Sequence, residues 1–205
     1  SPEQAAIEIR KHWSLNKGLI SNLVEVLESH GVILFGFDFN APNLDSRSFL
    51  TENGQPIIVY NKTLLGDRLR FALAFELGNI VMHGFNFVDL KHKANLFASE
   101  FLMPELDIKE DLKHPISIEL LSSLKKKWKV SMQSILFRAN TLRIISDNQK
   151  SYIWSQFLSL GIDKREPIIL DVEIEKPLFL LEFCKKTNTT KEFDSSLLKL
   201  LRQEL

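Results

Sequence analysis

The sequence predicts an α+β fold in which a small three-stranded sheet is followed by a series of helices. Segments rich in β-branched and aromatic residues, joined by short turns, lie between residues 32 and 60. From residue 65 to residue 160 apolar residues recur every three or four positions, which is the period of α-helices. The 205 residues, 44% of them hydrophobic, suit one large domain or two small ones with a substantial core.

Charge and cysteine content exclude several classes of protein. The 26 Lys+Arg residues balance 26 Asp+Glu residues, whereas domains that bind nucleic acid through phosphates usually carry a basic excess. The single cysteine, Cys184, can form neither an intrachain disulfide nor a thiolate metal site. No apolar run approaches the ~20 residues that span a bilayer, and the N-terminus lacks the layout of a signal peptide. We therefore expect a cytoplasmic protein without a membrane partner.

The first third of the chain is predicted to hold two helices and the three strands. Pro2 suits the first turn of a helix, and Gly31 suits the position just after the end of one. The strands are close in sequence and joined by short turns, which indicates a small antiparallel or mixed sheet. We expect helices at residues 2–13 and 21–30, and strands at residues 32–39, 45–50 and 56–60.

The remaining chain is predicted to be helical until a tail that contains two apolar runs. Helices are expected at residues 65–82, 93–103, 118–128, 131–142 and 147–160. In the tail we expect strand-like runs at residues 168–172 and 177–183 and an amphipathic helix at residues 195–201. The predicted organisation is a core at residues 1–114, a helical bundle at residues 115–162 and a C-terminal tail at residues 163–205.

The helix expected at residues 65–82 carries the frame of a zinc peptidase motif. In H-E-x-x-H, two histidines four residues apart hold the metal on one helical face, and the glutamate acts as general base. Here Phe75 and Asn79 stand in the two histidine positions, and Glu76 alone is retained. We expect Phe75 to fill the vacated metal cavity, and Glu76 to be either a buried acid bonded to Asn79 or a solvated one.

Two segments carry a resemblance to a known family. Arg-Phe-Ala-Leu-Ala-Phe-Glu-Leu-Gly-Asn at residues 70–79 is similar to R-F-x-x-A-H-E-L-G-H, and Ala-Asn-Leu-Phe-Ala-Ser-Glu-Phe-Leu-Met-Pro at residues 94–104 is similar to E-A-N-x-F-A-x-x-L-L-M-P. With its flanking stretches, the chain resembles the ImmA/IrrE family of metallopeptidase-like domains over roughly residues 2–160. The resemblance implies a zincin-like core with a degenerate motif, linked in bacteria to helix-turn-helix repressors of the XRE type.

The resemblance also implies where a third zinc ligand would lie. Active relatives have an acidic ligand just ahead of the A-N-x-F-A segment, and Lys91, His92 and Lys93 stand there in this chain, with His92 and Lys93 as the expected ligand slots. Because a catalytic zinc needs three protein ligands, we expect no zinc and no other cofactor. Glu76, His83 and His92 form an alternative, relocated metal site; otherwise His83 interacts with the dipole at a helix C-terminus.

A basic segment follows the core. Residues 117–150 hold seven basic and two acidic residues, a net charge of +5, within three short helices that look like a helix-turn-helix arrangement. The nucleic-acid contacts that this segment suggests are Lys125, Lys126, Lys127 and Lys129. A solvated helix face is the alternative interpretation of the same cluster.

These observations favour a catalytically inactive, peptidase-like domain that regulates or senses. It would belong to a bacterial transcriptional regulator or a mobile-element stress-response system and bind a protein partner or a small-molecule effector. The chain begins at Ser1 without Met, so we expect a missing N-terminal module to contact DNA, and the amphipathic C-terminal segment allows a homo-oligomer. Two alternatives stay open, namely a zinc-dependent endopeptidase with displaced ligands that cleaves a cognate repressor, and a DNA-binding module at residues 117–150.

Overall fold

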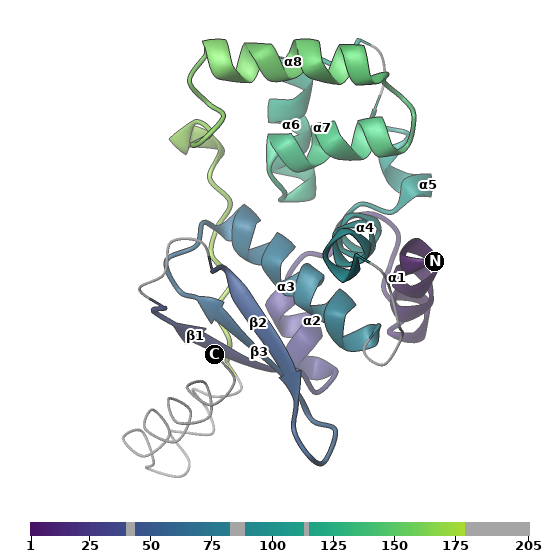
Figure 1. The fold of residues 1–205 in the computed structure, drawn as a ribbon, viewed down its shortest axis with the longest axis vertical. Helices are drawn as coiled ribbons and strands as arrows, with labels where there is room; N and C mark the ends of the chain where they lie inside the picture. Colours follow the sequence, from purple (N-terminus) through teal and green to yellow (C-terminus); the bar gives the residue numbers. More distant parts are fainter. Residues whose placement is uncertain (40–43, 83–88, 113–114, 179–205) are drawn as a thin grey trace.

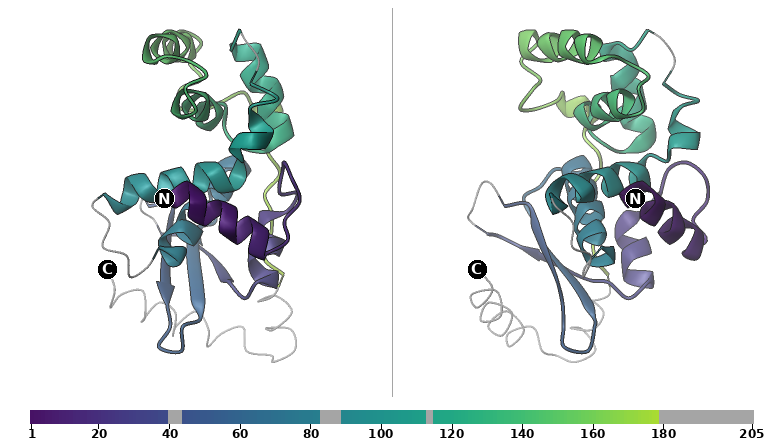
Figure 2. Two further views of the ribbon diagram at one scale, coloured as in Figure 1. Left: turned by 90° about the vertical axis from the view of Figure 1, so that its right-hand side faces the viewer. Right: turned by 45° about the vertical axis from the view of Figure 1, so that its right-hand side comes forward.

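The structure is a computed structural model that describes residues 1–39, 44–82, 89–112 and 115–178. Within these residues the chain forms eight α-helices, three strands and one short 3-10 helix. Figure 1 shows a helical bundle at one end of the molecule and the sheet at the other. Both views of Figure 2 keep this arrangement, with the helix α4 (Leu90–Leu102) lying between the two ends. The predicted α+β fold class is confirmed.

The sheet is mixed. It contains β1 (Ile33–Phe37), β2 (Ser46–Leu50) and β3 (Pro56–Asn61) in the spatial order β1-β3-β2, with β1 parallel and β2 antiparallel to β3. The central strand β3 buries Ile58, Val59 and Tyr60, as expected for an apolar strand with a neighbour on each side. Within the described sheet β2 is an edge strand, so one side of its backbone keeps free donors and acceptors.

Helices cover the sheet and one another. The helix α3 (Gly66–Val81) contacts β2 and β3 on one side and α4 on the other, and α1 (Pro2–His12) packs against α4. The helix α2 (Leu23–Ser29) contacts β1. A Cβ atom on Gly78 would lie 2.9 Å from the Phe97 ring, so glycine is what allows α3 and α4 to approach closely here.

Two features of the core differ from the prediction. The helix α4 begins at Leu90, three residues earlier than expected, because Asp89 caps it by accepting a hydrogen bond from the His92 amide at 3.2 Å. Its first turn is mostly polar and its one apolar residue, Leu90, is exposed, so hydrophobic periodicity could not reveal it. The second feature is the short helix α5 (Glu105–Ile108), which follows Pro104 and was not predicted.

The bundle matches the predicted helices to within one residue at each end. It consists of α6 (Ile118–Trp128), α7 (Met132–Thr141) and α8 (Asp147–Ser159), which contact one another. A serine caps the start of each of these helices, and the connections are short. The described residues contain no helix long and apolar enough to cross a membrane.

The tail differs from the prediction. The strand expected at residues 168–172 is wrong, since the structure has a 3-10 helix, η1 (Ile168–Leu170), directly after Pro167. Ile168 and Ile169 are 77% and 85% exposed, and no strand among the described residues pairs with this apolar run. Residues 171–178 then return from the bundle to the core (Figure 1). The predicted helix at residues 195–201 and Cys184 lie outside the described residues.

Candidate functional site

The candidate site is centred on Glu76, on the face of α3 that meets the strand β2. Glu76 is only 4% exposed, and its carboxylate accepts three hydrogen bonds. Ser46 Oγ donates to Oε1 at 2.9 Å, while Ser48 Oγ and Asn79 Nδ2 donate to Oε2 at 2.6 and 3.0 Å. Of the two expectations for Glu76, the structure therefore shows the buried acid bonded to Asn79.

Sequence reasoning missed the two serines. They are two residues apart on β2, so their side chains point to the same face of the sheet, the face covered by α3. Their hydroxyls supply two of the three hydrogen bonds that the buried carboxylate of Glu76 accepts. A polar residue at alternate positions of a predicted strand was the available signal, but the sequence did not show which helix would lie opposite.

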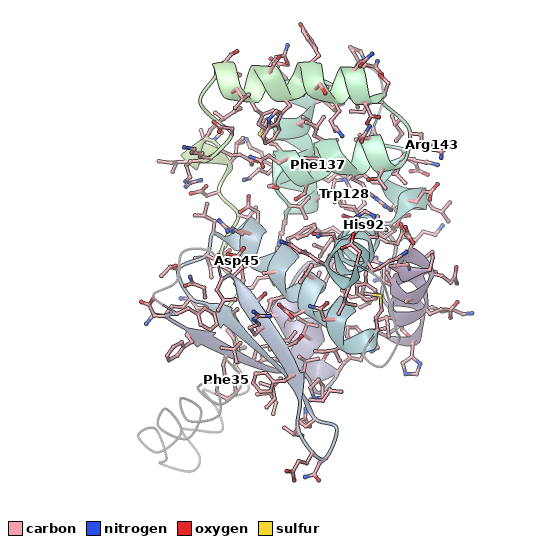
Figure 3. All side chains as sticks on the ribbon, viewed as in Figure 1. Phe35, Asp45, His92, Trp128, Phe137 and Arg143 are labelled. Atoms are coloured by element: carbon pink, nitrogen blue, oxygen red, sulfur yellow. The ribbon has the colours of Figure 1, made fainter. Side chains whose placement is uncertain are left out.

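A groove opens beside Glu76. Its volume is about 1900 Å³, and its walls come from β2, α3, the start of α4, the start of α7 and residues 163–166. Phe71, Phe75 and Asn79 follow one another at four-residue steps on α3 and all line this groove. Figure 3 labels Asp45 beside the start of β2 and His92 on α4, the two elements that contact α3 from either side.

The former ligand positions are only partly brought together. Phe75 and Asn79 line the groove, and Phe75 also packs against the hydrophobic core. On α4 the lining residues include Lys91 and Asn95, but neither His92 nor Lys93. His92 is exposed and its backbone amide donates to the capping side chain of Asp89, whereas Lys93 is half-buried on another face. Lys91 is thus the α4 residue of this trio that shares the groove with Glu76.

The described side chains do not fit a catalytic zinc ion. Phe75 carries no atom that could bind a metal, Asn79 offers only a neutral amide oxygen in place of the His, Cys, Asp or Glu ligands that zinc takes, and the ammonium group of a protonated Lys91 has no lone pair. Across residues 1–39, 44–82, 89–112 and 115–178 no group of three His, Cys, Asp or Glu side chains is placed to hold a metal. His83, one member of the alternative relocated site, lies outside the described residues.

More than half of the chain matches a known protein family. Residues 27–140 match the Peptidase_M78 family, whose domain is described as IrrE N-terminal-like. The chain belongs to the Peptidase_M78 family. A comparison with curated proteins gives no match. The matched region of the Peptidase_M78 domain begins within α2, contains the sheet, α3 and α4, and ends within α7 of the bundle.

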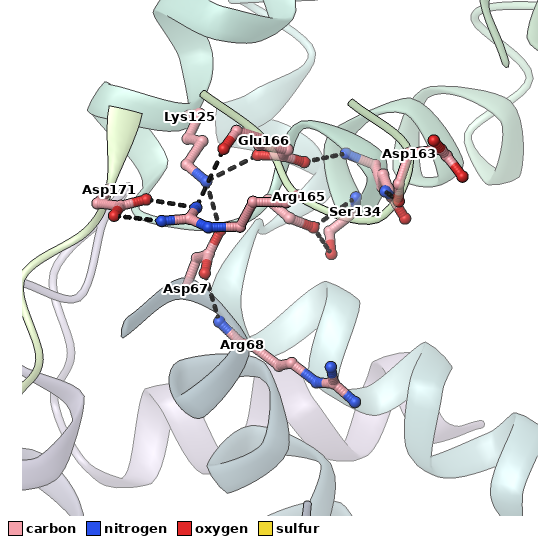
Figure 4. A network of polar contacts seen from close by, with 10 residues as sticks. Asp67, Arg68, Lys125, Ser134, Asp163, Arg165, Glu166 and Asp171 are labelled. Carbon is pink, nitrogen blue, oxygen red and sulfur yellow. Dashed lines mark hydrogen bonds and ion pairs between the residues drawn. The ribbon is translucent and has the colours of Figure 1, made fainter. Parts of the chain in front are cut away.

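The bundle of this Peptidase_M78 protein is held to its core by buried charges. Lys125 on α6 is 1% exposed, and its Nζ donates to Asp67 at 2.5 Å and to Glu166 at 2.7 Å, as Figure 4 shows. Burial by itself lowers the pKa of Lys125, but hydrogen bonds and charge interactions with both carboxylates outweigh it and raise the pKa above its ordinary value. Glu166 also accepts a hydrogen bond from the Gln133 amide in the first turn of α7.

Contacts within the protein occupy three of the four lysines expected to contact nucleic acid. Lys125 is buried and ion-paired, which differs from the expectation that it contacts nucleic acid, because a phosphate could not reach it. Lys127 pairs with Asp111 at 2.7 Å, and Lys129 donates to the Ser21 carbonyl at 2.8 Å. Lys126 is exposed.

A second buried charge ties the tail to the core. Arg70, the first residue of the peptidase-like motif, is 1% exposed, pairs with Glu175 and donates to the Ile20 carbonyl at 2.7 Å. Burial lowers the pKa of Arg70, although the negative charge of Glu175 acts in the opposite direction. Glu175 Oε2 also accepts from the amides of Leu23 and Val24 at the start of α2, at 2.7 and 3.0 Å.

Proposed function

We propose that this protein is a non-catalytic member of the Peptidase_M78 family, with a zincin-like core that binds a partner or effector instead of hydrolysing it. The observation that carries the proposal is the set of residues around Glu76. Phe75, Asn79 and Lys91 share the groove with the remnant general base, and none of them is a suitable zinc ligand in its observed role. The general base of such a peptidase acts on a water molecule that a metal ion activates, and these residues provide no ligands to hold that metal ion.

The groove keeps features that suit binding. It is large, its α3 wall is partly apolar, and it follows the edge of β2 that has no strand partner among the described residues. An extended segment of another protein could add to this edge through main-chain hydrogen bonds, with alternate side chains entering the groove. These features support a binding role that needs no chemistry.

The proposed setting is regulatory. We place the protein in the bacterial cytoplasm, as part of a transcriptional regulator or a mobile-element stress-response system, where it senses a protein partner or a small-molecule effector. DNA contact would be made by a separate N-terminal module, and the protein could act as a homo-oligomer. The bundle resembles a helix-turn-helix arrangement, but burial of Lys125 removes one of the basic residues that direct DNA binding would use.

The experiment is a metal analysis combined with a cleavage assay. The protein is purified without chelators, its zinc content is measured by mass spectrometry, and it is incubated with purified helix-turn-helix repressors of the XRE type. We expect substoichiometric zinc and no cleavage, unchanged by Glu76→Gln. Stoichiometric zinc together with cleavage that Glu76→Gln abolishes would establish the alternative, an endopeptidase with displaced ligands, and would overturn the proposal.

A further inference from the structure

Glu76 is a buried carboxylate that the described chain does not neutralise. No ion pair joins it to a Lys, Arg or His side chain in the ranges that the structure describes, and its three partners are two hydroxyls and an amide. The buried acids Asp67, Glu100 and Glu166, by contrast, each pair with a buried or nearly buried cation. A buried charge without a counter-charge is costly, and hydrogen bonds from neutral groups compensate only in part.

The carboxylate of Glu76 also has acceptor capacity to spare. A carboxylate offers about four lone-pair positions, of which Ser46 occupies one on Oε1 and Ser48 and Asn79 occupy two on Oε2. Oε1 therefore has room for one further donor. Because Glu76 lines the groove, that donor can arrive from a bound molecule.

The walls next to Glu76 suit a long side chain that ends in a positive charge. Phe71 and Phe75 are half-buried, line the groove and lie one helical turn apart on α3. Lysine and arginine bury their methylene stems along such apolar surfaces, and their cationic ends are attracted to aromatic rings. The outer edge of β2, unpaired within the part of the chain that the structure describes, runs beside the same wall and can hold an extended backbone.

Charges elsewhere in the groove do not cancel this preference. Six basic residues in the described part of the chain line the groove. Arg68, Lys125 and Arg165 each pair with a carboxylate of the protein. Arg47, Lys91 and Lys164 are exposed, so water and salt screen their repulsion of a cation. Glu76 is 4% exposed, so its attraction is screened much less. The buried carboxylate of Glu76 therefore has the largest electrostatic effect on which side chain binds next to it in the groove.

We propose that the groove binds an extended segment of a protein partner through a lysine or arginine side chain whose cationic group pairs with Glu76. The inference rests on the proposed non-catalytic function, since it assigns to the remnant general base the task of recognising a positive charge. The β2 edge would hold the backbone of the segment, and the groove would hold the selected side chain.

The test uses pools of acetylated, fluorescein-labelled nonapeptides. Each pool has one fixed central residue, namely Arg, Lys, Gln, Leu or Glu, and flanking positions randomised among Ser, Thr, Val and Tyr. Binding to the full chain is followed by fluorescence anisotropy. We expect the Arg or Lys pool to bind at least about tenfold more tightly than the Gln pool, which is the size of effect that a hydrogen-bonded charge gives.

Two variants distinguish a specific effect of Glu76 on peptide binding from an effect of the net charge of the groove. Glu76→Gln should remove the preference for basic peptides, whereas Glu52→Gln, which removes an equal charge from an exposed residue of the groove lining, should keep it. If Glu76→Gln does not fold, amide chemical shifts of the unmodified protein give the answer, because the Arg pool should shift Ser46, Ser48 and Asn79. Shifts confined to another surface would overturn the proposal.

The outcomes distinguish this inference from the proposed function. Zinc-free, inactive protein that shows no preference for basic peptides, or keeps it after Glu76→Gln, overturns the inference and leaves the non-catalytic function intact. Stoichiometric zinc with repressor cleavage overturns the non-catalytic function and the inference together. A basic preference that depends on Glu76 in zinc-free protein supports both.

Discussion

Ser48 donates a hydrogen bond of 2.6 Å from its hydroxyl to Oε2 of Glu76, and so connects the edge strand β2 to α3 across 28 positions of the chain. The general base of a peptidase must have an oxygen directed at the water that it activates. In this protein both carboxylate oxygens are held by side chains of the fold. Glu76 is therefore part of the contact between helix and sheet as well as part of the groove.

Removal of the Ser48 hydroxyl should destabilise the protein through Glu76. Ser48→Ala takes one donor from a buried carboxylate, and we expect the free energy of unfolding to fall by about 1–3 kcal/mol. The measurement is urea denaturation followed by circular dichroism. In a Glu76→Gln background the same serine substitution should cost clearly less, because the buried group is then uncharged. Equal losses in both backgrounds would show that Ser48 acts independently of Glu76.

The sequence was sufficient for most helices because their boundaries are marked locally. Ser117, Ser131 and Ser146 cap the bundle helices, and apolar residues repeat at helical spacing behind each of them. Local signals were misleading at Ile168–Leu170, where an apolar run that looks like a strand has no partner strand among the described residues and leaves Ile168 and Ile169 exposed. Strand formation depends on a neighbour, which the local sequence does not specify.

The site was predictable on α3 and much less so elsewhere. Glu76, Phe75 and Asn79 share one helix, so a fixed spacing was enough to place them together. The serines of β2 come from a strand about 30 positions earlier and depend on how the sheet packs. Lys125 likewise looks like one of several surface lysines in the sequence, and only tertiary packing places it between Asp67 and Glu166.

Gly66 should be needed for the return of the tail to the core. A Cβ atom at this position would lie 2.3 Å from the Val172 carbonyl oxygen, which is backbone and cannot rotate away. We expect Gly66→Ala to displace the tail and release Glu175 from the start of α2. Hydrogen exchange at the Leu23 and Val24 amides should then become faster, because these amides lose the hydrogen bonds that they donate to Glu175. Nuclear magnetic resonance measures both amides directly.

The control for this prediction is Glu175→Gln, which weakens the same attachment without a steric clash. The two substitutions should be less than additive in the free energy of unfolding, because each removes the same contacts. Full additivity would mean that the conflict at Gly66 is relieved within α3 and that the tail stays in place.

Lys125 should contribute to stability and not to recognition. Lys125→Met leaves Asp67 and Glu166 buried without their shared counter-charge, and we expect a loss of about 3–5 kcal/mol in urea denaturation. Combining it with Asp67→Asn and Glu166→Gln should recover much of the loss. Lys126→Met, at an exposed neighbouring position, serves as the matched control and should change stability by less than about 0.5 kcal/mol. A small effect of Lys125→Met would contradict the buried network.

Tyr60 should ionise at an unusually high pH in the folded protein. Burial raises its pKa to about 12, with a smaller contribution from the carboxylate of Glu28, compared with about 10 for an unperturbed tyrosine. The folded state thus favours the neutral phenol, so this contribution to stability is complete below pH ~10 and is lost as the pH rises towards ~12. The chain has two tyrosines, so the Tyr152→Phe variant isolates Tyr60 for titration by tyrosinate absorbance. The same midpoint in buffer and in concentrated urea would contradict the prediction.

If the groove is a peptidase site that has lost its ligands, restoring donors should restore zinc binding. Phe75→His and Asn79→His place two imidazoles four residues apart on α3, and Lys91→Glu adds a carboxylate from the α4 wall of the same groove. We expect the triple variant to bind one zinc ion per chain, measured by competition with a chromogenic chelator.

The matched control carries Lys93→Glu in place of Lys91→Glu, at a residue that does not line the groove. It should bind zinc at least about tenfold more weakly, because only two ligands then converge on the metal. Equal affinities would place the third ligand position at Lys93 and contradict the assignment to Lys91.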